Sequence, residues 1–254
     1  MLKFFRRIRH NLISQGKTSR YLKYAIGEII LVVIGILIAL QINNWNENRR
    51  QNIQVKNYLN SMVIDLNSDT LAYDRIIGNF ERQVEANTLI FKDENYQDLP
   101  LDSIVYSITS LFEMHQFVDQ TYQKIKNSGL SDNLGSKELN NAINHYYSNG
   151  IDRLSTYLQY DKERSTRDDD FWFLTNDYEI NLLHNKSAKN MNLPYIESEE
   201  LRKKAIIKKT ESNLGRNNLR HNIDRKTLGI AIAKQTKKEA ETLIQLINEE
   251  LNNL

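Results

Sequence analysis

The chain has 254 residues, of which 40% are apolar and 26% are charged, and its formal net charge is +2. It contains nine Gly, two Pro and no Cys, which excludes disulfides and Cys-ligated zinc or iron–sulfur sites. So few turn-forming residues argue against a β-sandwich or barrel and favour long helices.

The charges are unevenly distributed along the chain. Residues 1–23 hold seven Lys or Arg and no acidic residue, residues 46–200 hold 15 basic and 25 acidic residues, and residues 201–254 hold 12 basic and six acidic residues. Like charges at such density repel one another unless an anionic neighbour is present. The two basic ends therefore need not share a partner.

Residues 1–23 form a basic arm that we place in the cytoplasm. Its opening, MLKFFRRIRHNLI, places apolar residues at helical spacing with Arg and Lys elsewhere around the helix. This pattern is typical of an interfacial helix on anionic lipid. A purely topogenic signal explains the same residues equally well, and both interpretations stay open.

An apolar run follows from Tyr24 to Ile42, reading YAIGEIILVVIGILIALQI, nineteen residues with one charge. A helix of that length extends about 28 Å, which matches the hydrocarbon core of a bilayer. Trp45 then lies where an indole prefers the headgroup boundary. Seven basic residues precede the run, whereas residues 46–65 contain three. We therefore predict a transmembrane helix over residues 24–45 with the N-terminus in the cytoplasm.

Two other interpretations of the run are less favoured by its residues. A cleaved signal peptide needs small residues before the cut, but the run ends in ALQIN without an A-x-A pattern. A core helix of a soluble domain alternates apolar with polar positions, whereas Ile29 to Leu40 offers none.

One face of the predicted span carries Glu28, Gly35 and Ala39, at positions i, i+7 and i+11. Gly35 and Ala39 form a small-xxx-small pair that lets another helix approach closely. Glu28 is the one ionisable group of the span, and such groups are by default functional hypotheses. It also lies about one turn from the cytoplasmic boundary, where pairing with Lys23 or Arg20 would explain it. The stripe predicts contact with a second copy or with a membrane-protein partner.

Residues 46–254 are predicted to form a periplasmic helical bundle. Apolar residues from Tyr58 to Val84 recur at helical spacing, and this helix could extend directly from the membrane span. A loop over 92–100 precedes helices over 101–115 and 118–128, the second ended by Gly129. The next helix starts at Ser136 and runs to about residue 164. A loop over 184–193 and two final helices, 197–212 and 224–251, complete an all-α fold of about five or six helices.

Chemical motifs are scarce in this chain. Asp168, Asp169 and Asp170 suggest a cation site, but adjacent helical residues point about 100° apart, so a solvated helix start is the simpler interpretation. There is no H-E-x-x-H, Walker A, G-x-G-x-x-G or G-x-S-x-G motif. We expect no catalytic residue, cofactor or metal, although a triad of distant residues stays open. The predicted topology also argues against nucleic acid.

Four segments carry a resemblance to a known family: FFRRIRHNLIS, YAIGEIILVVIGILIALQINNWNE, YLNSMVIDL and TYQKIKNSGL. The chain resembles, along its whole length and most specifically at residues 4–47, a family of uncharacterised single-pass membrane proteins common in Bacteroidota. The resemblance implies an inner-membrane protein with a periplasmic helical region and supplies no activity or site residue. We expect a membrane-anchored interaction or scaffold protein. The alternatives are a ligand-sensing bundle working with a partner and, less favoured, a tethered enzyme.

Overall fold

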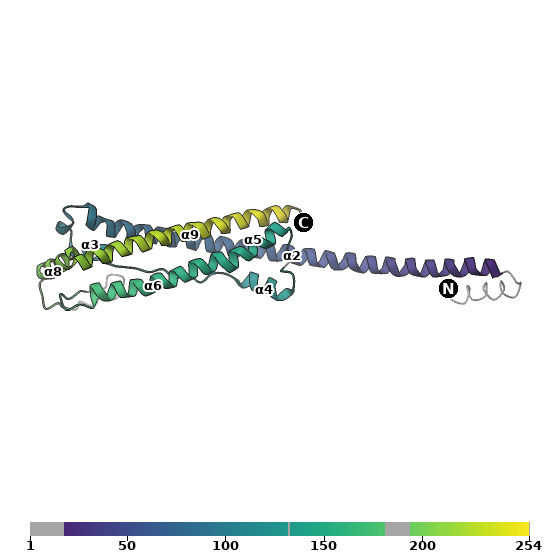
Figure 1. Ribbon diagram of the computed structural model, residues 1–254, viewed down its shortest axis with the longest axis horizontal. Coiled ribbons are helices and arrows are strands. Elements are labelled where there is room, and N and C mark those ends of the chain that lie inside the picture. Colours follow the sequence, from purple (N-terminus) through teal and green to yellow (C-terminus); the bar gives the residue numbers. More distant parts are fainter. Residues whose placement is uncertain (1–17, 132, 181–193, 254) are drawn as a thin grey trace. The chain divides into compact units, whose positions relative to one another are not determined.

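The computed structural model describes residues 18–131, 133–180 and 194–253, and every regular element within them is helical (Figure 1). The chain divides into two compact units, residues 1–57 and 58–254. The predicted all-α fold is therefore confirmed for the described residues. The basic arm up to residue 17 and the predicted loop over 184–193 lie outside them.

The first unit is formed by the start of helix α2 (Thr18–Lys92). No Pro and only three Gly occur in the 75 residues of this helix, so little interrupts its backbone hydrogen bonding. The side chains from Ile29 to Leu40 are all exposed, and Leu31 reaches 62% exposure. Among the described residues, α2 contains the one helix segment that is long and apolar enough to cross a membrane, and none of that segment is buried.

The second unit packs the rest of α2 with shorter elements. Helices α6 and α9 run side by side, α8 lies against α9 and α3, and α5 lies against α9 (Figure 1). The elements are η1 (Tyr96–Asp98), α3 (Leu101–Ile108), α4 (Gln120–Ser128), α5 (Lys137–His145), the π-helical turn η2 (Tyr146–Gly150), α6 (Ile151–Phe173), α8 (Glu199–Glu211) and α9 (Asn213–Asn253).

Local signals account for several helix ends. Ser136 caps α5 by accepting a hydrogen bond from the backbone N–H of Leu139 at 3.1 Å, and Ser198 caps α8 in the same way through Leu201. These caps satisfy N–H groups that have no partner within the helix. Gly129 ends α4 with a φ of +73°, a left-handed conformation that favours glycine.

Apolar side chains at helical spacing form the core of the second unit. One cluster of this core joins α3 to α8 and to the parts of α2, α6 and α9 that lie near it. The buried residues of α2 include Leu59, Met62, Leu66, Tyr73, Ile76 and Phe80, and the cluster at α3 includes Ile104, Val105, Ile108, Trp172, Ile206 and Leu219. The pattern predicted for residues 58–84 is therefore the buried face of α2.

Helix α9 approaches its neighbours closely at Gly229. A Cβ atom there would lie 2.6 Å from Cε1 of Tyr157 on α6 and 2.7 Å from Cε2 of Phe80 on α2. The two rings are themselves packed edge to face, with centroids 6.5 Å apart. Because Gly229 has no side chain, α2, α6 and α9 can pack closely against one another at this point of the core.

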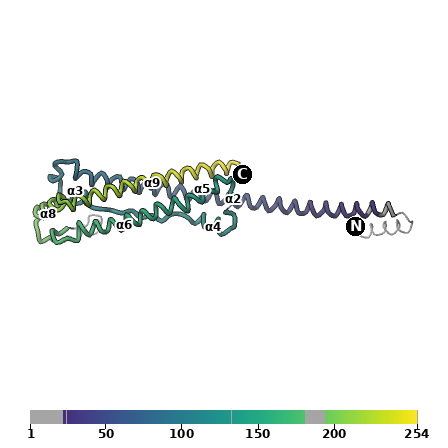
Figure 2. The backbone as a smooth tube through the Cα atoms, in the orientation of Figure 1, coloured from purple at the N-terminus to yellow at the C-terminus, as the bar shows by residue number. Residues whose placement is uncertain are grey.

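The helix predicted over 101–115 was wrong in its second half. α3 ends at Ile108, and residues 109–119, here called the strap, run along the unit to α4 (Figure 2). Leu111, Glu113 and His115 are partly buried, while Phe112 and Met114 between them are exposed. Such a period of two is typical of an extended segment with one face on a core.

Three other predictions also need correction. The helix capped by Ser136 continues through η2 to Phe173, and α9 begins at Asn213 rather than at residue 224. Asp168, Asp169 and Asp170 were predicted at a solvated helix start, but they lie in the last turns of α6. Asp168 is buried there because it pairs with a residue of α9, as described next.

Candidate functional site

Two basic residues of α9 are buried against a carboxylate of α6. Asp161 and Lys226 both have fully buried side chains, and Nζ of Lys226 lies 2.7 and 2.8 Å from the two carboxylate oxygens of Asp161. Nε of Arg225 donates to the same carboxylate at 2.9 Å. Charges are seldom fully buried unless they are paired in this way.

The Arg225 guanidinium extends this contact into a network. One of its Nη atoms donates to Asp168 at 2.7 Å and to the amide oxygen of Asn222 at 2.8 Å. Asn218 in turn donates to Asp168 and accepts from the indole N–H of Trp172, each at 2.7 Å. The residues of α6 in this network, Asp161, Ser165, Asp168 and Trp172, share one face of the helix at helical spacing.

The same network holds the strap in place. Nζ of Lys226 donates to the backbone carbonyl of Leu111 at 2.6 Å, and Ser110 contacts both Ser165 and Asn222 through its hydroxyl. From α2, Gln83 accepts a hydrogen bond from the backbone N–H of Leu111. A backbone that leaves helical conformation inside a core needs such side-chain partners, so the polar cluster and the strap depend on each other.

The network carries no net charge, and the N–H groups of Lys226 all have hydrogen-bond partners. Asp161 and Asp168 oppose Arg225 and Lys226, so the buried charges cancel. Burial lowers the pKa of Lys226 to about 8, although the Asp161 carboxylate opposes that shift. The ammonium donates to Asp161, Leu111 and Ser165 and so uses its three N–H groups. The arrangement suits a structural lock between helices rather than a nucleophile or base.

Burial of the Asp169 carboxylate, beside this network, costs free energy that its contacts do not fully offset. Its Oδ1 atom is buried without a hydrogen-bond partner among the described residues. Burial raises the pKa of Asp169 to about 6, and the neighbouring Asp168 carboxylate adds to the shift, while a hydrogen bond with the Ser110 backbone opposes it. The folded state therefore holds a proton on Asp169 at pH values where the unfolded chain has lost it.

Asp169→Asn is expected to stabilise the protein near neutral pH. Because the folded pKa is raised, the Asp169 contribution to stability falls as pH rises from about 4 through 6, and the amide removes this loss. After allowance for partial exposure, we expect a gain of about 1–2 kcal/mol at pH 7.5 that nearly vanishes at pH 4. Thermal unfolding followed by circular dichroism at both pH values measures it. The exposed Asp170→Asn variant is the control, and equal gains at both pH values would contradict the assignment.

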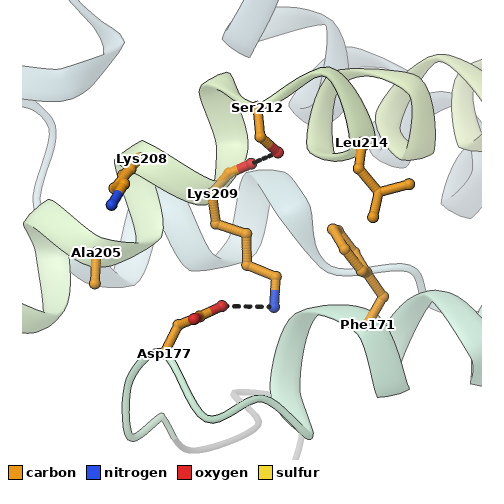
Figure 3. A pocket seen from close by; sticks show the side chains of 7 residues that line it. All are labelled: Phe171, Asp177, Ala205, Lys208, Lys209, Ser212 and Leu214. Carbon is orange, nitrogen blue, oxygen red and sulfur yellow. Dashed lines mark hydrogen bonds and ion pairs between the residues drawn. The ribbon is translucent and has the colours of Figure 1, made fainter.

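A pocket of about 530 Å³ lies at the junction of α8 and α9, within the range of small-molecule sites (Figure 3). We call it the Lys209 pocket. Lys209 extends from α8 between Asp177 and Phe171. Its ammonium nitrogen is 4.6 Å from the centroid of the Phe171 ring, 5.5 Å from that of Tyr178, and 3.5 Å from an Asp177 oxygen. The lining residues are Phe171, Asp177, Ala205, Lys208, Lys209, Ser212 and Leu214.

The backbone that carries Lys209 is held by Ser212, between the two helices. The Ser212 hydroxyl donates to the Lys209 carbonyl at 2.6 Å (Figure 3). The same hydroxyl accepts from the backbone N–H of Gly215 at 3.0 Å. Ser212 thus forms both the C-terminal cap of α8 and the N-terminal cap of α9. A fixed junction gives the pocket a defined shape.

The predicted membrane stripe lies apart in sequence from both sites. Glu28, Gly35 and Ala39 are residues of α2; Glu28 is partly buried, and the other two are exposed. Nothing lies within 4 Å of a Cβ built on Gly35. Among the described residues, no group of three or more His, Asp or Glu side chains could hold a metal ion.

The polar network and the Lys209 pocket were not predicted from the sequence. The face shared by Asp161, Ser165 and Asp168 was a usable signal, because three polar residues replace apolar ones at core spacing on α6. Their partners Arg225 and Lys226 lie 57 to 65 residues further on. The pocket has no comparable signal, since it depends on how α8 meets the end of α6.

Comparison with known proteins gives one match. A family model described as a family of unknown function (DUF6090) matches residues 28–162. No curated protein and no solved structure matches the chain. The match runs from within the predicted span, through the strap, to about the middle of α6, and it exceeds half of the sequence. The chain therefore belongs to this family of unknown function.

Proposed function

We propose that this protein is a single-pass inner-membrane protein whose second unit, residues 58–254, acts in the periplasm as an interaction or scaffold module. The observation that carries the proposal is the exposed apolar segment of α2, where the side chains from Ile29 to Leu40 contact no core. Water would disfavour such a surface by roughly 25 cal/mol for each Å². A lipid bilayer is the environment that removes this cost.

The orientation follows from charge on either side of that segment. Seven basic residues precede it within residues 1–23, and three follow within residues 46–65. Basic residues are retained on the cytoplasmic side of a bacterial membrane. The N-terminus is therefore cytoplasmic in this proposal, and the helical unit is on the outer side.

An interaction role fits the chemistry of both parts of the chain. In the second unit, the buried charged side chains of α6 and α9 use their polar atoms on one another, which leaves little reactive capacity. In the first unit, Gly35 and Ala39 present a surface that a second helix could approach closely, with Glu28 as a polar group on the same face. A second copy or another membrane protein is the partner we propose for this stripe.

A ligand-sensing bundle is the second candidate function, and the Lys209 pocket favours it. That pocket combines an ammonium group with exposed apolar surface. In this hypothesis, a partner protein carries the signal onward from the second unit.

Reporter fusions at the C-terminus test the proposed topology. A reporter that is active only in the periplasm should give signal after residue 254, and a reporter that is active only in the cytoplasm should give none. The matched control deletes residues 24–45, which should abolish the periplasmic signal. Signal from the cytoplasmic reporter on the complete chain would overturn the location of the second unit.

Purification from membranes in mild detergent separates the two candidate functions. A protein that co-purifies in fixed proportion supports the scaffold role, and replacing Gly35 and Ala39 by Leu should release it if the stripe forms the contact. A retained small molecule, without a protein partner, supports sensing instead.

A further inference from the structure

We propose that the Lys209 pocket binds a small organic anion that carries an apolar ring or chain. This proposal deepens the sensing candidate by naming its ligand class, and it rests on that candidate only for its biological role. Binding itself follows from the pocket, as the contacts of Lys209, the local charge and the apolar lining indicate.

Lys209 is a partly buried cation with a weakly bound anionic partner. Its side chain is only 12% exposed, whereas that of Asp177 is 63% exposed. The two charged atoms are 3.5 Å apart, compared with about 2.8 Å for a well-formed charged hydrogen bond. Among the described residues, Asp177 is the one carboxylate paired with Lys209. A ligand anion could therefore form a shorter bond to the ammonium group than Asp177 does.

The charge around the pocket favours an anion. Lys208 and Lys209 both line it, and Asp177 is the single acidic residue among those lining side chains that the structure describes. The nearby carboxylate of Glu211 is already hydrogen-bonded by Gln97 and Tyr96. A single negative charge on the ligand would bring the pocket to neutrality, which lowers the cost of enclosing Lys209 further.

The remaining wall of the pocket is apolar. Phe171 and Leu214 face the Lys209 side chain across the cavity (Figure 3), and Leu214 is largely exposed. The Phe171 ring holds the ammonium over its face, so a ligand that reaches the nitrogen must lie beside the ring. An inorganic anion would leave this surface in water. An anion with a ring or short chain would cover it.

Benzoate tests the proposal, using the complete protein in nanodiscs of neutral lipid and saturation-transfer NMR to obtain Kd. Benzoate should bind, while acetate, which lacks the ring, and benzyl alcohol, which lacks the charge, should each bind about tenfold more weakly. Lys209→Met should weaken benzoate binding by about tenfold or more. Asp177→Asn should strengthen it about threefold, because the competing carboxylate is removed.

Lys234→Met is the matched control, since this exposed lysine of α9 pairs with Glu81 away from the pocket; it should leave the benzoate Kd unchanged. Adding anionic lipid to the nanodiscs identifies the source of the natural ligand. Competition with benzoate indicates a membrane lipid, and no competition indicates a soluble anion. Absence of benzoate binding, or equal binding after Lys209→Met, would overturn the proposal without affecting the topology experiment.

Discussion

Replacing Asp161 with Leu is expected to lower the free energy of unfolding by about 3–5 kcal/mol. The substitution leaves the fully buried ammonium of Lys226 without its carboxylate partner, and an uncompensated buried charge is among the most costly defects in a core. Lys226→Met should cost less, about 1.5–3 kcal/mol, because Asp161 keeps the charged hydrogen bond from Nε of Arg225 at 2.9 Å. Chemical denaturation followed by circular dichroism measures each value.

The double variant, Asp161→Leu with Lys226→Met, should recover most of this loss. Arg225 keeps its bond to Asp168 at 2.7 Å, so the remaining network stays neutral. A cost of about 1–2 kcal/mol remains, because the carbonyl of Leu111 and Nε of Arg225 both lose their partners. The exposed Lys234→Met variant should change stability by less than about 1 kcal/mol. Additive single effects in the double variant would show that the two charges do not stabilise each other.

Gly229→Ala is expected to destabilise the protein by about 2 kcal/mol. Alanine normally favours a helix over glycine by about 1 kcal/mol, but here its methyl group would meet the rings of Tyr157 and Phe80 at less than 3 Å. Neither ring can move easily, since the Tyr157 hydroxyl donates to the Arg225 carbonyl and Phe80 is fully buried. Overpacking of this kind typically costs about 1–3 kcal/mol.

The same substitution at Gly78 should have the opposite sign. A Cβ on Gly78 meets only the end of the Arg82 side chain, at 3.8 Å, so the gain in helix propensity of about 0.5–1 kcal/mol is not offset. Thermal unfolding of the two variants side by side gives the comparison. A gain at Gly229 would mean that α9 lies further from α2 and α6 than the structure places it.

The parts of the fold that were predictable are those set by local sequence. Ser136 and Gly129 marked helix ends because capping depends on only a few neighbouring residues. The apolar spacing after Tyr58 indicated the buried face of α2 because its period matches the helix. The apolar run before Asn43 indicated a helix long and apolar enough to cross a membrane, and α2 contains such a segment among the described residues.

The errors came from segments whose conformation depends on distant residues. The strap was predicted as helix because Leu111 and Phe112 follow α3 without a break; its extended form is held by Gln83 and Lys226. The last helix was predicted to start at residue 224, but α9 starts at Asn213. Gly215 lies there in close contact with the backbone of α8, which no local pattern indicates. The Lys209 pocket also depends on contacts between elements that are separate in the sequence, so local sequence patterns could not predict it.

The position of Arg225 and Lys226 in the last helix also determines the order in which the molecule can be completed. Their partners Ser110 and Leu111 lie 115 residues earlier in the chain, and bringing such distant residues together requires closure of a long loop. Until α9 has been synthesised, Asp161 lacks its partners Arg225 and Lys226, and the strap is held only by its bonds to other helices, such as that to Gln83. High contact order of this kind slows folding. The polar network therefore forms late in folding, and it can form only in a chain that includes α9.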